Sequence, residues 1–143
     1  MKNLSIKFLS IFLIVFLLGL SGTIKAQSAG ISSMAVSISV VNEYTQSRDF
    51  VLKRQAGMIL SPIVPYETIY EGSIGYAYWD YYQGFLVKCI TRIPIDSIPL
   101  FNDKCRIRFE SEGLSEEFTI VKGAGKFISI LIKNTGAITI TQR

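Results

Sequence analysis

An aromatic-rich segment, residues 66–85, carries the side chains of this sequence that are best suited to binding. Its aromatic residues are Tyr66, Tyr70, Tyr76, Tyr78, Trp79, Tyr81, Tyr82 and Phe85. Strand alternation can bury only about half of such a set, and exposed Tyr and Trp are typical of carbohydrate platforms, membrane-interface contacts and protein hot spots. The candidate binding residues, at and beside an expected turn, are Tyr76, Tyr78, Trp79, Asp80, Tyr81 and Tyr82. The alternative is a set of core residues with a self-packed loop.

Few residues in this chain are suited to acid–base catalysis. The sequence contains no histidine, which removes the commonest general base and the usual Ser–His and Cys–His nucleophile pairs. Glu67, Glu71 and Asp80 flank the aromatic residues, and two carboxylates roughly 5 to 9.5 Å apart could hydrolyse a glycoside. The alternative is that all three are solvated turn residues. We therefore expect a protein that is not an enzyme, with a small carboxylate-dependent hydrolase as a minor alternative.

No cofactor or metal site is expected. The glycine-rich residues 123–126 lack the spacing and the Ser or Thr of a phosphate loop, and no helix is expected after them. The acidic residues 110–117 lack the regular ligand spacing of a calcium site. Two cysteines without histidine cannot complete an ordinary zinc site.

Cys89 and Cys105 are the only cysteines. Alternation places both on the inward faces of neighbouring strands, residues 85–93 and 104–110, joined by an expected loop at residues 94–103. Antiparallel pairing could bring them opposite each other in an oxidising compartment, so we expect a disulfide bond. The alternative is two small buried thiols.

The N-terminal residues predict export. Lys2 and Lys7 precede an apolar run at residues 8–20, and small residues follow before Ala26, which is the layout of a secretory signal peptide cleaved after Ala26. A membrane anchor is the alternative, but a span needs about 20 apolar residues. No cysteine near the cleavage site could carry a lipid. The expected location is periplasmic, cell-surface or secreted.

Removal of residues 1–26 also changes the charge. The whole chain has 15 basic and 11 acidic residues, and three of the basic ones leave with the signal, which gives 12 − 11 = +1. A nearly neutral domain lacks the basic surface of a nucleic-acid binder. The expected organisation is a signal peptide at residues 1–26, a flexible leader at 27–33 and one domain at 34–143.

The remaining sequence predicts about eight or nine short strands and no helix. Residues 34–41 alternate strictly, with Met34, Val36, Ile38 and Val40 directed inward. The other expected strands are residues 50–54, 68–70, 76–79, 85–93, 104–110, 118–121, 127–133 and 137–141. Expected turns or loops are residues 72–75, 80–84, 110–117, 122–126 and 134–136, and the proline-containing residues 58–66 read as an edge or a loop. This pattern predicts a single antiparallel β-sandwich, with a small β-barrel as the alternative.

The order of these elements resembles a known group of proteins. Val41-Asn42 ends a strand, a polar turn leads to residues 50–53, and a proline-containing segment precedes Thr68-Ile69-Tyr70-Glu71-Gly72-Ser73-Ile74-Gly75. Over residues 34–93 this order is similar to the aegerolysin and actinoporin-like β-sandwich proteins. The resemblance implies binding to lipid head groups and assistance in pore formation.

Two function classes therefore stand from the sequence. The first is an exported, non-catalytic binding or interaction module that uses the aromatic surface to bind glycan, lipid or another exported protein. The second is a membrane-active protein of the pore-forming type. An assembly subunit that offers an unpaired edge strand is a further alternative.

Overall fold

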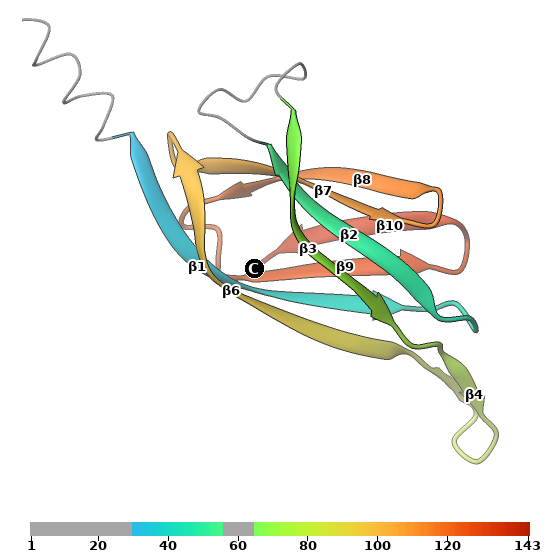
Figure 1. Cartoon of the computed structure of the whole chain (residues 1–143). Helices are drawn as coiled ribbons and strands as arrows, with labels where there is room; N and C mark the ends of the chain where they lie inside the picture. Colours follow the sequence, from blue (N-terminus) through green and yellow to red (C-terminus); the bar gives the residue numbers. More distant parts are fainter. Residues whose placement is uncertain (1–29, 56–64) are drawn as a thin grey trace, which may run out of the picture. The chain divides into compact units, whose positions relative to one another are not determined.

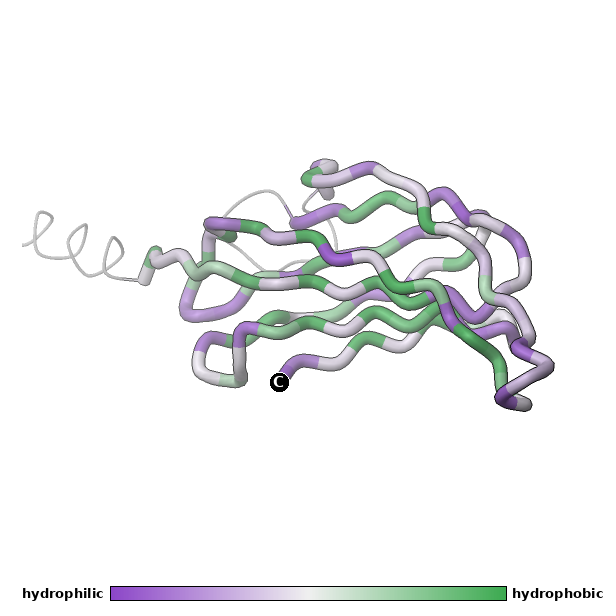
Figure 2. The backbone as a smooth tube through the Cα atoms, turned by 90° about the horizontal axis from the view of Figure 1, so that it is seen from below, coloured by the Kyte–Doolittle hydropathy of each residue, from purple (hydrophilic) through white to green (hydrophobic). Residues whose placement is uncertain are grey.

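The computed structural model describes residues 30–55 and 65–143, and these ranges contain ten β-strands (Figure 1). They are β1 (Ile31–Asn42), β2 (Arg48–Gln55), β3 (Tyr66–Ile74), β4 (Tyr78–Asp80), β5 (Phe85–Val87), β6 (Cys89–Phe101), β7 (Lys104–Ser111), β8 (Leu114–Val121), β9 (Phe127–Lys133) and β10 (Ala137–Gln142). The expected signal peptide and most of the segment 58–66 lie outside the described residues. Hydrophobic and hydrophilic residues alternate along the strands, as a sheet with one buried face requires (Figure 2).

Eight strands form one mixed sheet, and β4 and β5 form a separate two-stranded sheet. The large sheet has the order β10-β9-β1-β6-β7-β2-β3, with β8 on the other side of β7. It folds over at the β6–β7 hairpin, so β10-β9-β1-β6 lie opposite β8-β7-β2-β3 and the edge pairs β10/β8 and β3/β6 come into contact. The sheet is not closed into a barrel. The predicted β-sandwich is confirmed, except that β1 and β9 pair in parallel.

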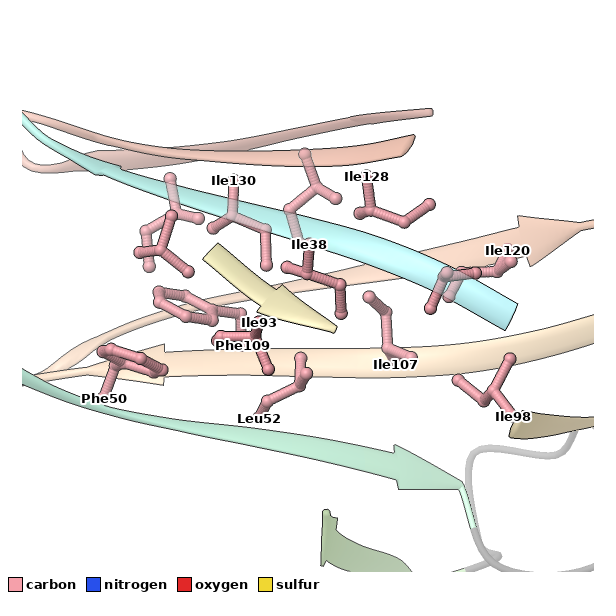
Figure 3. Close-up of a cluster of buried hydrophobic side chains, with 14 of the residues drawn as sticks. Ile38, Phe50, Leu52, Ile93, Ile98, Ile107, Phe109, Ile120, Ile128 and Ile130 are labelled. Carbon is pink, nitrogen blue, oxygen red and sulfur yellow. The ribbon is translucent and has the colours of Figure 1, made fainter. Parts of the chain in front are cut away.

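The core consists of inward-facing side chains from both layers (Figure 3). On β1 the predicted residues Val36, Ile38 and Val40 are buried, and Met34 packs against them. The opposite layer contributes Leu52, Ile107 and Phe109 among others. Each fully buried aliphatic or aromatic side chain contributes about 1.5–3 kcal/mol relative to an exposed one, so this cluster is the main source of stability.

The strand that carries the prolines is longer than predicted. Residues 94–103 were expected to form a loop, but β6 continues to Phe101 and only Asn102 and Asp103 turn. Among the described residues, β6 pairs with β7 only through Phe101 and Lys104, so most of that side of β6 lacks a strand partner. Proline lacks the N–H that a ladder uses, and within sheets it is found on strands that are unpaired along one side.

Other boundaries also differ from the prediction. β1 begins at Ile31, so residues 31–33 of the expected flexible leader are in a strand. The acidic residues 110–117 are mostly strand, since Glu112 and Gly113 alone form the turn, with φ values of 43° and 86°. Residues 85–93 are not one strand, because β5 ends at Val87 and β6 begins at Cys89.

Gly72 lies within β3, whereas a turn was predicted at residues 72–75. Gly72 pairs with Phe50 of β2, and the rings of Phe50 and Tyr70 stack beside it with centroids 5.8 Å apart. A Cβ atom at Gly72 would lie 2.8 Å from Cε1 of Tyr70 and 3.2 Å from Cζ of Phe50. The glycine therefore permits close approach of two rings to the strand and does not form a turn.

The disulfide predicted between Cys89 and Cys105 is absent, and both are free thiols. The inward direction of Cys105 was predicted correctly, but the register was not. The two-residue turn pairs Phe101 with Lys104, which places Cys105 beside Leu100. Cys89 lies 100 − 89 = 11 residues earlier on β6, roughly 36 Å along an extended strand, and no disulfide spans that distance.

Candidate functional site

The aromatic ribbon, defined as residues 76–87, projects from one end of the sandwich (Figure 1). It consists of the approach to β4, the strands β4 and β5, and the turn between them. Strand β4 begins at Tyr78, two residues later than predicted, and the turn at residues 81–84 follows where a turn was expected. All six candidate binding residues are in this ribbon: Tyr76, Tyr78, Trp79, Asp80, Tyr81 and Tyr82.

The aromatic side chains of the ribbon are exposed. Tyr81 and Tyr82 at the tip are 88% and 104% exposed, and Trp79 is 49% exposed. Tyr76, Tyr78 and Phe85 are also exposed, by about half of their surface. Soluble proteins rarely expose a contiguous apolar patch of more than a few hundred Å² without a use for it. These residues therefore form a surface and not a core.

Asp80 shapes the tip of the ribbon. Its Oδ1 accepts hydrogen bonds from the backbone N–H groups of Tyr82 at 2.9 Å and Gln83 at 3.1 Å, and its carbonyl accepts the N–H of Gly84 at 2.7 Å. Gly84 has a φ of 75°, which favours glycine. Asp80 therefore organises the turn through its carboxylate and presents the two tip tyrosines to solvent.

The two faces of the ribbon carry different rings. Trp79 pairs with Leu86 across the two strands, so these side chains share one face. Tyr78 and Phe85 lie on the opposite face, because successive strand residues point to opposite sides. Both faces remain about half exposed, and the aromatic surface is consequently two-sided.

Asn42 joins the base of the ribbon to the sandwich. Its fully buried side chain donates from Nδ2 to the carbonyl groups of Gly75 at 2.9 Å and Gln46 at 3.0 Å, and its Oδ1 accepts the N–H of Tyr44 at 3.0 Å. The carbonyl of Tyr44 in turn accepts the N–H of Ala77 at 2.7 Å. The approach to β4 is thus held at two successive points.

Arg48 completes this attachment from the start of β2. The buried guanidinium donates from Nε to Oγ of Ser111 at 3.2 Å and from Nη2 to the Ser111 carbonyl at 3.0 Å. It lies 4.2 Å from the ring centroid of Tyr44, and its Nη1 is 3.5 Å from a carboxylate oxygen of Glu112. We call Asn42, Tyr44, Arg48 and Ser111 the polar anchor.

The polar anchor was not predicted from the sequence. Its contacts join residues far apart in the chain, such as Arg48 and Ser111, which are 63 positions apart. The available signal was limited to Asn42, a polar residue at the end of a strictly alternating strand. Nothing in the local sequence distinguishes Arg48 from a solvated arginine.

The three carboxylates considered for hydrolysis lie at different places in the fold, Glu67 and Glu71 on β3 and Asp80 at the end of β4. Glu67 at the start of β3 forms an ion pair with Arg54, and Glu71 follows four residues later on the same strand. Asp80 lies beyond the other end of β3 and uses its carboxylate in the ribbon turn. Along an extended strand Glu67 is about 13 Å from Glu71 and about 23 Å from residue 74 at the other end of β3, and both distances exceed the roughly 9.5 Å limit for glycoside hydrolysis.

Glu110 of β7 and Glu117 of β8 are paired with cations on the sheet surface. Lys53 contacts the carboxylate of Glu110 at 2.9 Å, and Arg108 forms an ion pair with Glu117. The hydrogen bond from Arg108 is the main reason that the pKa of Glu117 is lowered. Within residues 30–55 and 65–143, no group of three or more His, Cys, Asp or Glu side chains could hold a metal ion.

The two thiols differ in environment. Cys105 is buried, and burial raises its pKa to about 11, partly opposed by the charge of Arg54. Cys89 is partly exposed and lies near Gly75, where a Cβ atom would be 3.2 Å from its Sγ. Thiolate formation at neutral pH is therefore suppressed at Cys105.

Comparison of the chain with protein-family models and with curated proteins finds no match. In the part of the chain that the structure describes, no helix has the length and apolar character needed to cross a membrane.

Proposed function

We propose that this protein is an exported, non-catalytic β-sandwich that binds a partner through the aromatic ribbon. The observation that carries this proposal is the exposure of six aromatic side chains on a projecting element, with Tyr81 and Tyr82 at its tip. Export rests on the signal-peptide layout of residues 1–26. Tyr and Trp provide large, stiff contact surfaces with polar ends, which suits recognition at a surface.

The attachment of the ribbon supports a binding role. Asn42 and Arg48 are buried polar side chains whose hydrogen bonds hold the segments at the base of the ribbon. A contact element fixed in this way loses little conformational entropy when it binds. The proposed site therefore combines an exposed aromatic surface with a rigid base.

Trp79 allows a direct test because it is the only tryptophan in the chain. At concentrations low enough for the single chain to predominate, the protein, expressed from its full sequence and purified from the exported fraction, should show solvent-exposed Trp79 emission that acrylamide quenches readily. Titration with liposomes, with soluble polysaccharides and with extracts of exported proteins should shift this emission for one ligand class. A tryptophan that acrylamide cannot reach and that no ligand affects would contradict the proposal.

Substitutions in the ribbon test whether the change in Trp79 emission reports ligand binding to the ribbon. Replacing both tip tyrosines, Tyr81→Ser with Tyr82→Ser, should weaken ligand binding by at least about tenfold, because aromatic hot-spot residues each contribute more than about 1 kcal/mol. Phe127→Ser provides the matched control, since Phe127 is a 61% exposed aromatic residue on β9 outside the ribbon. Equal weakening by both changes would point to a general loss of exposed apolar surface.

A membrane-active protein is the second candidate function. The exposed aromatic patch at one end of the sandwich favours it, because Tyr and Trp prefer the interfacial region of a bilayer. It also agrees with the resemblance to aegerolysin and actinoporin-like proteins. A Trp79 blue shift with liposomes alone, together with dye release from the vesicles, would support this candidate over a glycan or protein ligand.

A further inference from the structure

At the outer edge of β4, the backbone groups of Trp79 are free to pair with another strand. In the two-stranded sheet β4–β5, the carbonyl of Asp80 bonds to Gly84 inside the ribbon. Neighbouring strand residues direct their backbone groups to opposite sides, so the N–H and C=O of Trp79 point to the outer edge. Among the described strands, only β5 pairs with β4. Two residues before Trp79 on the same side, the N–H of Ala77 bonds to the carbonyl of Tyr44, so the open part of this edge lies at Trp79 and beyond.

The second edge of the ribbon is less accessible. The outward position on β5 is Leu86, which is followed closely by Lys88. The ammonium group of Lys88 lies 3.6 Å from the carboxylate of Glu43. Lysine beside an edge strand discourages pairing with another strand, whereas β4 has no such residue.

The exposed aromatic area of the ribbon is similar in size to the area that one partner buries in a protein–protein interface. Together the six rings expose the equivalent of about four whole aromatic side chains, or roughly 800 Å² at about 200 Å² each. A standard protein–protein interface buries about 800 Å² per partner, and the largest apolar patch of a typical monomer is about 300–600 Å². The six rings therefore expose about as much surface as one partner buries in a standard interface, and a strand at the β4 edge would cover the part of it beside Trp79.

The geometry disfavours the other occupants. A glycan stacks on one face, but the rings of Trp79 and Phe85 lie on opposite faces of the ribbon. A bilayer core cannot accommodate an open strand edge, because the unpaired N–H and C=O groups would lack partners there. Contact at the bilayer interface would use the rings but leave the edge without a strand partner. A strand from another protein surface satisfies both the edge and the two faces.

We propose that the partner is a second copy of this chain, which pairs β4 with β4 about a two-fold axis at Trp79. The inference rests on the proposed function, since it names the partner of the same ribbon. Trp79 lies opposite Trp79 of the other copy, and the two ribbons form one four-stranded sheet, β5-β4-β4-β5. The contact is isologous, so every favourable contact off the axis occurs twice.

Charge is compatible with this register. Asp80 is the only charged residue in the ribbon, and its carboxylate already accepts two backbone N–H groups. Pairing about Trp79 places Asp80 opposite Tyr78 of the other copy and not opposite a second Asp80. Like charges do not meet across the axis.

Sedimentation equilibrium of the full exported protein tests the proposal. Wild type should dimerise with a dissociation constant below about 100 µM. Trp79→Lys places two like charges opposite each other on the axis and should raise the dimer dissociation constant by more than about 100-fold. Leu86→Lys makes the same change on the other edge and should alter it by less than about threefold. Circular dichroism checks that each variant is folded.

Charge reversal gives a second, independent measurement. Trp79→Glu should also be monomeric, and an equimolar mixture of the Trp79→Lys and Trp79→Glu variants should form heterodimers. A wild type that is monomeric up to about 1 mM, equal effects of the changes at Trp79 and Leu86, or no heterodimer in the mixture would each overturn the inference.

The outcomes separate this inference from the proposed function. If the wild type is monomeric but its Trp79 emission responds to vesicles or polysaccharide, self-pairing is wrong and the ribbon remains a binding site. If the wild type is monomeric and acrylamide cannot reach Trp79, both fail.

Discussion

Asn42→Ala should destabilise the protein more than any exposed substitution. The asparagine amide is fully buried and makes three hydrogen bonds, to Gly75, Gln46 and the N–H of Tyr44. Each such bond contributes a net 0.5–1.5 kcal/mol, and a buried partner left without one loses about 1–3 kcal/mol. We expect a loss of about 3 kcal/mol in the free energy of unfolding, since water can solvate part of the opened site.

Urea unfolding followed by circular dichroism measures this loss. With a slope near 1.5 kcal/mol/M, a loss of about 3 kcal/mol lowers the urea midpoint by about 2 M. The melting temperature of a domain of this size should fall by roughly 10–15 °C. Hydrogen exchange at the Ala77 amide, which bonds to the carbonyl of Tyr44 at 2.7 Å, should accelerate more than exchange within the β9 strand.

The control is Asn134→Ala, which removes an exposed asparagine from the turn before β10. It should change the free energy of unfolding by less than about 0.5 kcal/mol. If Asn42→Ala and Asn134→Ala had the same stability within 1 kcal/mol, the hydrogen bonds of Asn42 would not stabilise the fold, and our account of the polar anchor would be wrong.

Two further substitutions test the packing around β3 and β7. Gly72→Ala should destabilise by about 1–3 kcal/mol, because its Cβ would crowd Tyr70 and Phe50, while the exposed neighbour Ser73→Ala should be nearly neutral in the same urea assay. Burial raises the pKa of the Cys105 thiol from 9.0 to about 11. The stabilisation that the folded state gains from the protonated thiol is therefore complete below pH 9, and it is lost as the pH rises to about 11, because the unfolded chain deprotonates first. Between pH 8 and 11 the wild type should therefore lose up to roughly 2–3 kcal/mol more than Cys105→Ala, and parallel pH profiles would contradict this.

The alternating strands were predictable because one face of each is buried. In β1 the inward set Val36, Ile38 and Val40 follows from a period of two, and β10 repeats it with Ile138 and Ile140. A register slip of one residue would expose the whole apolar set of such a strand, so the pattern specifies both the strand and its buried face.

Register between strands was not predictable. Alternation correctly directed Cys105 inward, but the position opposite it depends on the length of the turn after Phe101. The prolines suggested a long loop at residues 94–103, and a ten-residue loop would allow many pairings. A two-residue turn allows one, and it separates Cys89 from Cys105.

The exposure of the ribbon was also not predictable from the sequence. Aromatic residues favour half-buried strands in general, so composition fits a core strand and a surface ribbon equally well. The difference arises because the sandwich is complete without these side chains. Within the described residues, the buried cluster includes none of the six ring-bearing residues of the ribbon, and Ala77 is the only buried residue between 76 and 87.

Folding and association can consequently be perturbed separately. Asn42 belongs to the buried attachment, so its substitution should lower the free energy of unfolding whether or not a partner is bound. Trp79 is half exposed and lies outside the buried cluster, so its substitution should change association and leave the urea midpoint of the monomer nearly unchanged. A two-stranded ribbon with open edges is marginal in water on its own and invites pairing. The polar anchor maintains this ribbon in the single chain, and we infer that pairing with a second copy covers it.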